Sequence, residues 1–187
     1  MNRILLDSLR QETQTLHAQL DTHPMLRALL ADNFSISYYA QALSVLYEPQ
    51  KILEVTVIKR LNDYFPDHYY SARYPFIAQD LKSLGHIIPK QSMVFDDIEN
   101  ADQLLGVLYV LEGAKLGAKK IMRHLEGKGC PFSFFQSGND NNMSGWSGFL
   151  HLAECSSLNP AVVTEMAVKS FNCYLKALRC ADMRVNP

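Results

Sequence analysis

The sequence lacks several features that would assign the protein to a class at once. No apolar run approaches the ~20 residues that a membrane-spanning helix needs, and the opening residues MNRILLDSLRQE become charged sooner than those of a signal peptide. The formal net charge is only -1, so overall basicity does not favour a nucleic-acid binder. We therefore expect a cytoplasmic protein that acts neither on membranes nor on nucleic acids.

Cysteine is scarce and shows no metal-binding pattern. The four cysteines form no C-x-x-C pair and do not alternate with histidine at the spacing of a zinc site. We interpret them as reduced thiols that pack as small core residues. A catalytic cysteine is the alternative, but no surrounding pattern singles out Cys130, Cys155, Cys173 or Cys180.

Strand-like alternation is missing as well, whereas apolar residues recur at helical spacing through most of the chain. The chain has 187 residues, 48% of them hydrophobic and 20% charged, which is the size and composition of one globular domain. The sequence therefore predicts a single all-α domain over residues 1–187. The expected helices cover about 7–21, 24–30, 36–62, 76–84, 101–126, 146–154 and 160–181, with a polar loop at 136–145.

Two positions in the third expected helix carry specific signals. Ser35 can cap its first turn, with Phe34 just outside it. Pro49 removes one backbone donor within the same helix, so we expect a bend there.

Three glycines interrupt the longest expected helix, at Gly106, Gly113 and Gly117. An interior glycine costs a helix about 1 kcal/mol relative to alanine. At ~100° per residue the three directions differ by no more than about 40°, so the glycines share one face. That face allows close approach either of another helix or of a flat ligand, and the spacing alone does not choose between them.

His17 lies on the first expected helix, and Asp21 follows it one turn later. A carboxylate at that spacing can accept the Nδ1 proton of the imidazole and leave Nε2 free to bind a metal. The alternative is a surface histidine that is simply paired with an aspartate.

Together these residues resemble the bacterial heme oxygenases of the biliverdin-producing branch. The segment LRQETQTLHAQLD is similar to the family's first helix, in which the histidine is the axial ligand of the heme iron. The segment GVLYVLEGAKLGAKKI is similar to its distal helix, whose two glycines pass over the heme face. Weaker matches, among them SYYAQALSVLY, DLKSLG and PFSFFQSG, extend the resemblance over nearly the whole chain.

The resemblance implies a multi-helical bundle that holds heme, as substrate and cofactor, between two helices. It implies an oxidoreductase that uses O2 and electrons from a ferredoxin, flavodoxin or reductase to give biliverdin, carbon monoxide and ferrous iron. His17 would be the axial ligand, acting with Gly113 and Gly117 in catalysis. The heme-binding residues that it implies are Arg10, His17, Asp21, Tyr109, Gly113, Ala114 and Gly117.

The chain departs from the family pattern after Gly113. Relatives carry a serine or an acid there, whereas Ala114 has no side chain that can hydrogen-bond. The basic residues that hold the second propionate are not clearly matched either, and His151, Lys176 and Arg179 are only candidates. A heme-binding or heme-sensing protein of the same fold is therefore the alternative function.

Five basic residues lie between positions 115 and 128, against a single acid, Glu126. They are Lys115, Lys119, Lys120, Arg123 and Lys128. They form either a solvated helix face or a docking surface for an acidic electron donor.

Two other helical classes fit poorly. A di-iron carboxylate oxidase needs Glu-x-x-His elements, which this sequence lacks. A thiaminase-like hydrolase needs a nucleophilic cysteine, for which Cys130, flanked by Gly129 and Pro131, is a poor candidate.

Overall fold

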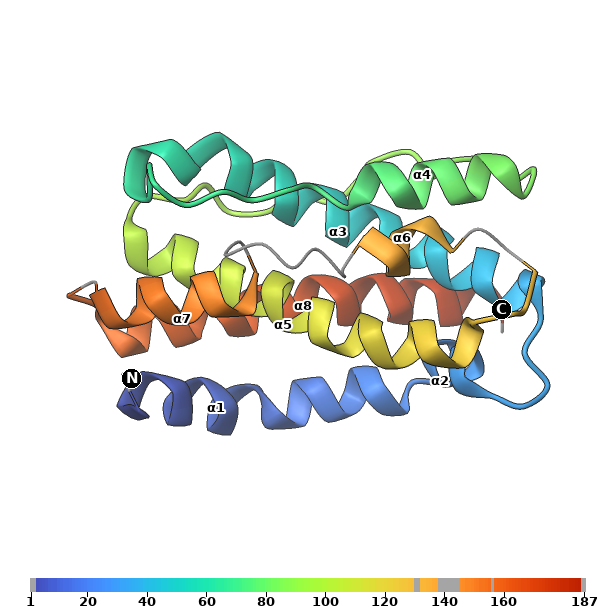
Figure 1. The fold of residues 1–187 in the computed structure, drawn as a ribbon, viewed down its shortest axis with the longest axis horizontal. Helices are drawn as coiled ribbons and strands as arrows, with labels where there is room; N and C mark the ends of the chain where they lie inside the picture. The colour runs from blue at the N-terminus through green and yellow to red at the C-terminus, as the bar shows by residue number, and fades with distance from the viewer. Residues whose placement is uncertain (1–2, 130–131, 138–144, 156, 186–187) are drawn as a thin grey trace.

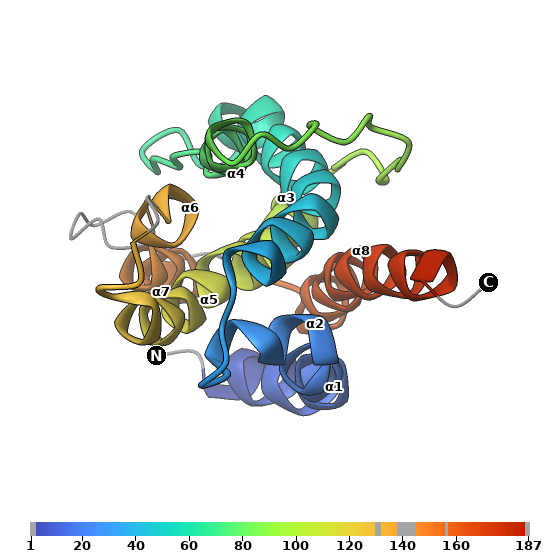
Figure 2. The ribbon, with the colours of Figure 1, turned by 90° about the vertical axis from the view of Figure 1, so that its right-hand side faces the viewer.

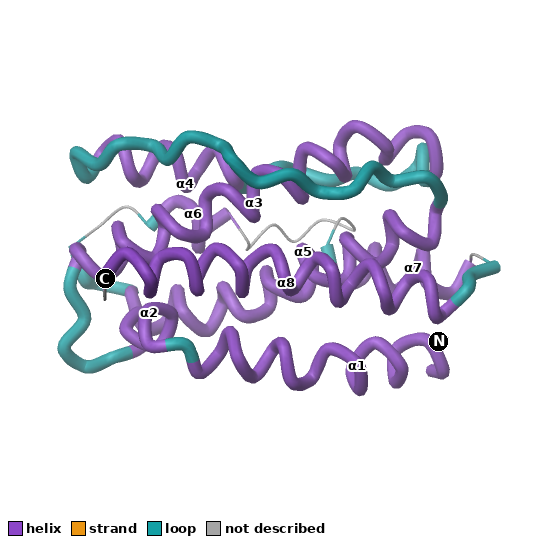
Figure 3. The backbone as a smooth tube through the Cα atoms, turned by 180° about the vertical axis from the view of Figure 1, so that it is seen from behind, coloured by secondary structure: helices purple, strands orange, loops and turns teal. Residues whose placement is uncertain are grey.

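A computed structural model describes residues 3–129, 132–137, 145–155 and 157–185, and within these ranges it contains only helices and loops. The predicted all-α class is thus confirmed (Figure 1, Figure 3). The elements are α1 (Arg3–Thr22), α2 (Pro24–Arg27), the 3-10 turn η1 (Ala28–Leu30), α3 (Ile36–Tyr64), α4 (Tyr74–Ser83), α5 (Ala101–Leu125), α6 (Ser133–Gln136), α7 (Trp146–Cys155) and α8 (Pro160–Val185).

The helices pack in layers. Figure 2 shows α1 and α2 on one side, α3 and α4 on the other, and α5 with α8 between them. Helix α8 packs against α1, α3 and α5, and α7 covers α5 near the middle of its length. Fully buried apolar side chains from several elements fill the centre, including Leu9, Leu53, Leu108, Phe149 and Val163. Burial of this apolar surface is the main favourable contribution to folding.

Helix boundaries follow the expected capping chemistry. The hydroxyl oxygen of Ser35 accepts a hydrogen bond from the Tyr38 amide at 3.2 Å, which confirms the predicted cap of α3. Helix α3 continues through Pro49. Helix α1 begins at Arg3, four residues before the expected start, because Leu5 and Leu6 are buried in the core. Most of the loop expected at 136–145 lies outside the described residues.

The short helix α6 was not expected, and a buried carboxylate holds it in place. Asp80 of α4 accepts hydrogen bonds from the Tyr39 hydroxyl at 2.5 Å and from the Ser133 and Phe134 amides at 3.1 and 3.0 Å. Asp80 is fully buried. These three donors compensate for its loss of hydration, so α6 is fixed to α3 and α4.

A second buried carboxylate, Glu54 of α3, organises the connection between α3 and α4. It accepts hydrogen bonds from Gln50, from the Tyr70 hydroxyl and from the amides of Arg73 and Tyr74, at 2.7–2.9 Å. Burial and the nearby Glu54 carboxylate raise the pKa of Tyr70 well above its ordinary value. Helix α3, which bears Glu54, packs against α5 on the side away from α1 (Figure 2).

None of the described helices is both long enough and apolar enough to span a bilayer.

Cys173 and Cys180 are free, half-buried thiols. Burial raises the pKa of Cys173 to about 11, so it remains a thiol at neutral pH. Cys130 and the side chain of Cys155 lie outside the described residues.

Candidate functional site

The first component of the site is an imidazole on α1. Nδ1 of His17 lies 2.9 Å from Oδ2 of Asp21, so the contact that the sequence predicts is present. At this distance the carboxylate can accept the Nδ1 proton of a neutral imidazole, a tautomer in which Nε2 carries the lone pair. No described residue forms a hydrogen bond with Nε2. The His17 side chain is 62% exposed, and the edge of its ring meets Phe171 of α8 at 5.9 Å between centroids.

The second component is the glycine face of α5, where the structure separates two roles. A Cβ atom at Gly106 would lie 2.3 Å from the carbonyl oxygen of Val163, so this glycine allows α5 to pack against α8. A Cβ atom at Gly113 would meet only the edge of Trp146, at 3.8 Å, and one at Gly117 would meet nothing within 4 Å. Of the two explanations left open by the spacing, helix packing holds for Gly106, whereas Gly117 borders open space and Gly113 has room for a Cβ atom in ordinary contact with Trp146.

Two polar contacts connect this face of α5 to the N-terminal layer. The hydroxyl groups of Thr13 on α1 and Tyr109 on α5 lie 3.5 Å apart. Fifteen residues after Tyr109, Nε2 of His124 lies 3.1 Å from the carbonyl oxygen of Ala31, just after η1. Gly113 and Gly117 lie between these two contacts, on a helix segment about 22 Å long.

An aromatic cluster closes the N-terminal end of the segment. The Trp146 and Phe149 rings stack at 4.9 Å between centroids, and the Tyr109 ring lies 5.8 and 5.7 Å from them. The cluster comes from α5 and α7 and borders Gly113 through the Trp146 edge. It gives the site an apolar end wall.

The arrangement fits one class of metal ligand. Within the described ranges, no group of three or more histidine, cysteine or acidic side chains could hold a metal ion. The exposed donor on α1 is one imidazole nitrogen of His17, and Gly117 of α5 borders open space. One such donor suits a metal that a flat organic ligand already coordinates, because the ligand supplies the other bonds.

The other predicted residues are exposed on their helices. Arg10 lies on α1 two turns before His17, is 68% exposed, and makes a loose ion pair with Asp7 at 3.8 Å. Ala114 is exposed beside Gly113. The candidates Lys176 and Arg179 are both exposed on α8, and His151 is exposed on α7.

Lys115 does not lie at the surface with the other basic residues of α5. Lys115 was expected to face solvent with the other cations, but its side chain is only 13% exposed. Its ammonium donates to Oε1 of the fully buried Glu112 at 2.9 Å and lies 4.6 Å from the centre of the Tyr70 ring. Burial raises the pKa of Glu112 despite this cation.

This buried cluster contains the polar residues that sequence reasoning missed. Oε2 of Glu112 and Nε2 of His68 are buried without a hydrogen-bond partner among the described residues. The only early signal was the spacing of Glu112 and Lys115, three residues apart on one helix. That spacing occurs equally on exposed helix faces, so it does not reveal burial.

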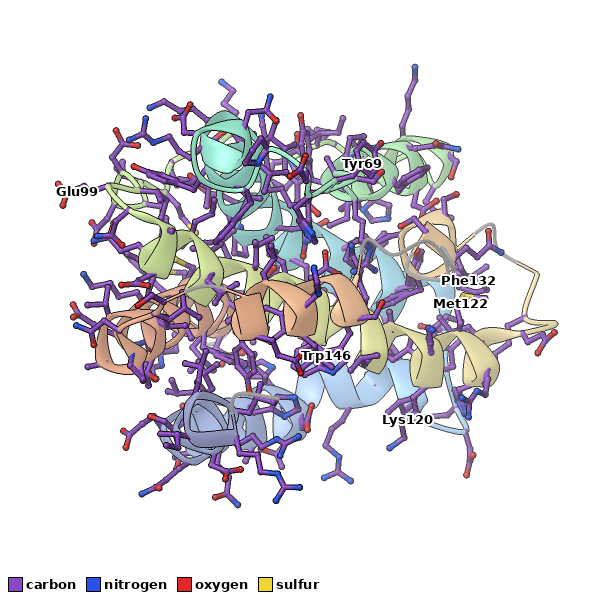
Figure 4. The ribbon with its side chains drawn as sticks, turned by 60° about the vertical axis from the view of Figure 1, so that its left-hand side comes forward. Tyr69, Glu99, Lys120, Met122, Phe132 and Trp146 are labelled. Atoms are coloured by element: carbon purple, nitrogen blue, oxygen red, sulfur yellow. The ribbon has the colours of Figure 1, made fainter. Side chains whose placement is uncertain are left out.

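Three of the remaining cations lie around a hollow at the C-terminal end of α5. The hollow has a volume of about 390 Å³, and Lys119, Arg123 and Lys128 contribute to its lining. Met122 and Phe132 supply apolar wall, and Figure 4 shows these two side chains close together near the end of the helix. Lys128 also lies 5.4 Å from the centre of the Phe34 ring.

Comparisons with known proteins identify the family and the fold. The heme oxygenase family model matches residues 3–179. The fold is similar to that of the Neisseria meningitidis heme oxygenase solved with bound NO and CO, with a TM-score of 0.70 and 21% identity, covering 95% of this chain and 91% of that one. It is also similar to heme oxygenase-1 of the cyanobacterium Synechocystis in complex with heme, with a TM-score of 0.70 and 13% identity, covering 96% and 91%. No curated protein sequence matches the chain. Since the family match spans nearly all of the sequence, the chain belongs to the heme oxygenase family.

Proposed function

We propose that the protein cleaves heme to biliverdin, carbon monoxide and ferrous iron, using O2 and electrons from a partner protein. Family membership supports heme degradation in general, and one structural neighbour is a heme complex. The observation that carries the proposal is the open space at Gly117 of α5, a helix whose Tyr109 hydroxyl reaches Thr13 on the helix that bears His17.

Each residue has a defined task in this proposal. His17 binds the iron through Nε2, and Asp21 holds the imidazole in the required tautomer through the 2.9 Å contact. Gly113 and Gly117 leave room for the macrocycle against α5. The bound heme supplies the iron and the reacting carbon atoms and is itself consumed. The protein contributes mainly position, because it fixes which edge of the macrocycle can react.

The aromatic end wall and Ala114 define the polarity of the distal side. Tyr109, Trp146 and Phe149 exclude bulk water from the N-terminal end of the site. Ala114 offers no hydrogen bond, so any ordered water near Gly113 is held by backbone groups or by more distant side chains. The missing side-chain hydrogen bond at Ala114 favours the second candidate function, that of a heme-binding or heme-sensing protein without turnover.

The basic hollow is the proposed docking surface for the electron donor. Lys119, Arg123 and Lys128 present positive charge at the end of the helix that carries the glycines. An acidic ferredoxin or flavodoxin would be attracted to it, and charge complementarity chiefly raises the association rate. We expect Arg123→Glu to slow reduction by such a donor and not by dithionite, a small reductant. Equal slowing with both reductants would argue against docking at the hollow.

Titration with hemin, followed by one turnover, tests the proposed function. We expect a Soret band typical of histidine-ligated heme at one equivalent. Addition of ascorbate or reduced ferredoxin in air should then remove that band as biliverdin and carbon monoxide form. A Soret band that persists under the same conditions would support the heme-binding alternative. Failure to bind hemin would contradict both functions.

A further inference from the structure

A short stretch of α5, residues 113–117, has few side chains that hold it in place. We call it the glycine segment, because Gly113 and Gly117 form its two ends. Between them, Ala114 is exposed and Leu116 is 48% exposed. An interior glycine also costs a helix about 1 kcal/mol relative to alanine. The position of the segment therefore depends on the one side chain that remains, at its centre.

Lys115 is that central residue, and its side chain lies on the face of α5 opposite the two glycines. At ~100° per residue, it leaves the helix about 160° from the direction of each glycine. The side chain is only 13% exposed. Its ammonium donates a hydrogen bond to Oε1 of Glu112 at 2.9 Å and lies 4.6 Å from the centre of the Tyr70 ring. No other side chain of the glycine segment is buried to this extent.

The Tyr70 ring is a firmly held support for this ammonium group. Tyr70 is 5% exposed, and its hydroxyl donates a hydrogen bond to Oε1 of Glu54 at 2.7 Å. Glu54 belongs to α3, which lies on the far side of α5 from α1 (Figure 2). An aromatic face attracts a cation more strongly when the pair is partly removed from water. A chain of contacts thus connects the glycine segment, through Lys115 and Tyr70, to α3.

We propose that Lys115 is a positioning residue, which keeps the glycine segment in one place and so fixes the open space at Gly117. The inference rests on the proposed function, because that function puts the macrocycle in this space. While the contact with Tyr70 is intact, the segment needs no rearrangement to receive a ligand. Without the contact, the segment samples several positions, and the apparent affinity falls with the fraction that leaves the correct space.

Hydrogen exchange of the apoprotein tests this positioning role without any ligand. We expect Lys115→Ala to speed amide exchange over residues 113–118 about tenfold, as for loss of a partly buried cation–π contact, and to leave exchange in α8 unchanged. Tyr70→Leu should speed exchange in the same residues, because it removes the ring from the other side of the contact. Lys120→Ala, at an exposed position of the same helix, is the matched control and should exchange like the wild-type protein.

Hemin titration then tests the consequence for binding. We expect Lys115→Ala to weaken hemin binding about threefold, because only part of the population has the segment correctly placed. Lys115→Ala leaves the buried carboxylate of Glu112 without its cation. The double variant Glu112→Gln/Lys115→Ala removes both charges, so it provides the same test if the single variant does not fold, with the same changes expected in exchange and affinity.

The outcomes separate this inference from the proposed function. Wild-type exchange over residues 113–118 in these variants, or an equal rise in α8, would overturn the positioning role of Lys115 and leave the proposed function intact. Faster local exchange with unchanged hemin affinity would also overturn the inference, because the place of the segment would then not affect binding. A wild-type protein that binds no hemin would overturn the proposed function, and exchange in the apoprotein would still decide whether Lys115 holds the segment.

Discussion

Gly106 of α5 lies directly against Val163 of α8: a Cβ atom at position 106 would stand 2.3 Å from the Val163 carbonyl oxygen and 2.8 Å from the Met166 Cβ. Both obstacles belong to the core and cannot turn aside as a flexible side chain can. We expect Gly106→Ala to reduce the free energy of unfolding by about 1–3 kcal/mol, because forced overpacking outweighs the better helix propensity of alanine. Urea unfolding followed by circular dichroism measures the change. Wild-type stability in this variant would contradict the close approach of the two helices.

Gly117 should respond in the opposite way. A Cβ atom there meets nothing within 4 Å, so Gly117→Ala should raise apoprotein stability by up to ~1 kcal/mol through helix propensity alone. Gly117→Leu should also fold, but its side chain should fill the space that the macrocycle needs and so abolish tight hemin binding. Hemin titration of the glycine, alanine and leucine proteins tests this. If affinity did not depend on side-chain size, the ligand would lie elsewhere.

His17 is the residue on which the iron contact depends. We expect His17→Ala to fold normally, since the side chain is 62% exposed, and to lose the spectrum of histidine-ligated heme together with turnover. Added imidazole should restore part of the spectrum by occupying the vacated position. His86→Ala, at an exposed position after α4, serves as the control and should keep the wild-type spectrum. An unchanged spectrum in His17→Ala would exclude this residue as the ligand.

Local sequence patterns predicted the features that local physics determines. The cap at Ser35 and the contact between His17 and Asp21 each depend on residues within four positions of one another. Helix periodicity and the glycines near the end of α5 gave its bounds to within one residue, because the signals lie in the segment itself.

Local sequence patterns could not predict features that depend on contacts between segments far apart in the chain. The three glycines of α5 look alike in sequence, and only the position of α8 shows that Gly106 has a different role. Lys115 was wrongly expected in solvent, because the Tyr70 ring that covers it comes from a loop 45 residues earlier. Helix α6 is stabilised by Asp80, more than 50 positions away.

His68 should give the stability of the protein a measurable pH dependence. Burial, and next the positive charge of Lys115, lower the pKa of His68 below its ordinary value of 6.5, and its Nε2 has no described hydrogen-bond partner. The unfolded chain therefore takes up a proton at a higher pH than the folded protein does. The stability contributed by neutral His68 is present above pH 6.5 and is lost as the pH falls toward the folded-state pKa.

Thermal unfolding between pH 7.5 and 5.5 tests this dependence. We expect the wild-type melting temperature to fall over this range, and to fall by less in His68→Phe, which removes the titrating group without breaking a side-chain hydrogen bond. His86→Phe is the matched control, since His86 is exposed and should leave the wild-type pH dependence unchanged. If the melting temperatures of His68→Phe and the wild-type protein fell in parallel with pH, His68 would have the same pKa in the folded and unfolded states. That result would contradict a buried environment shared with Lys115.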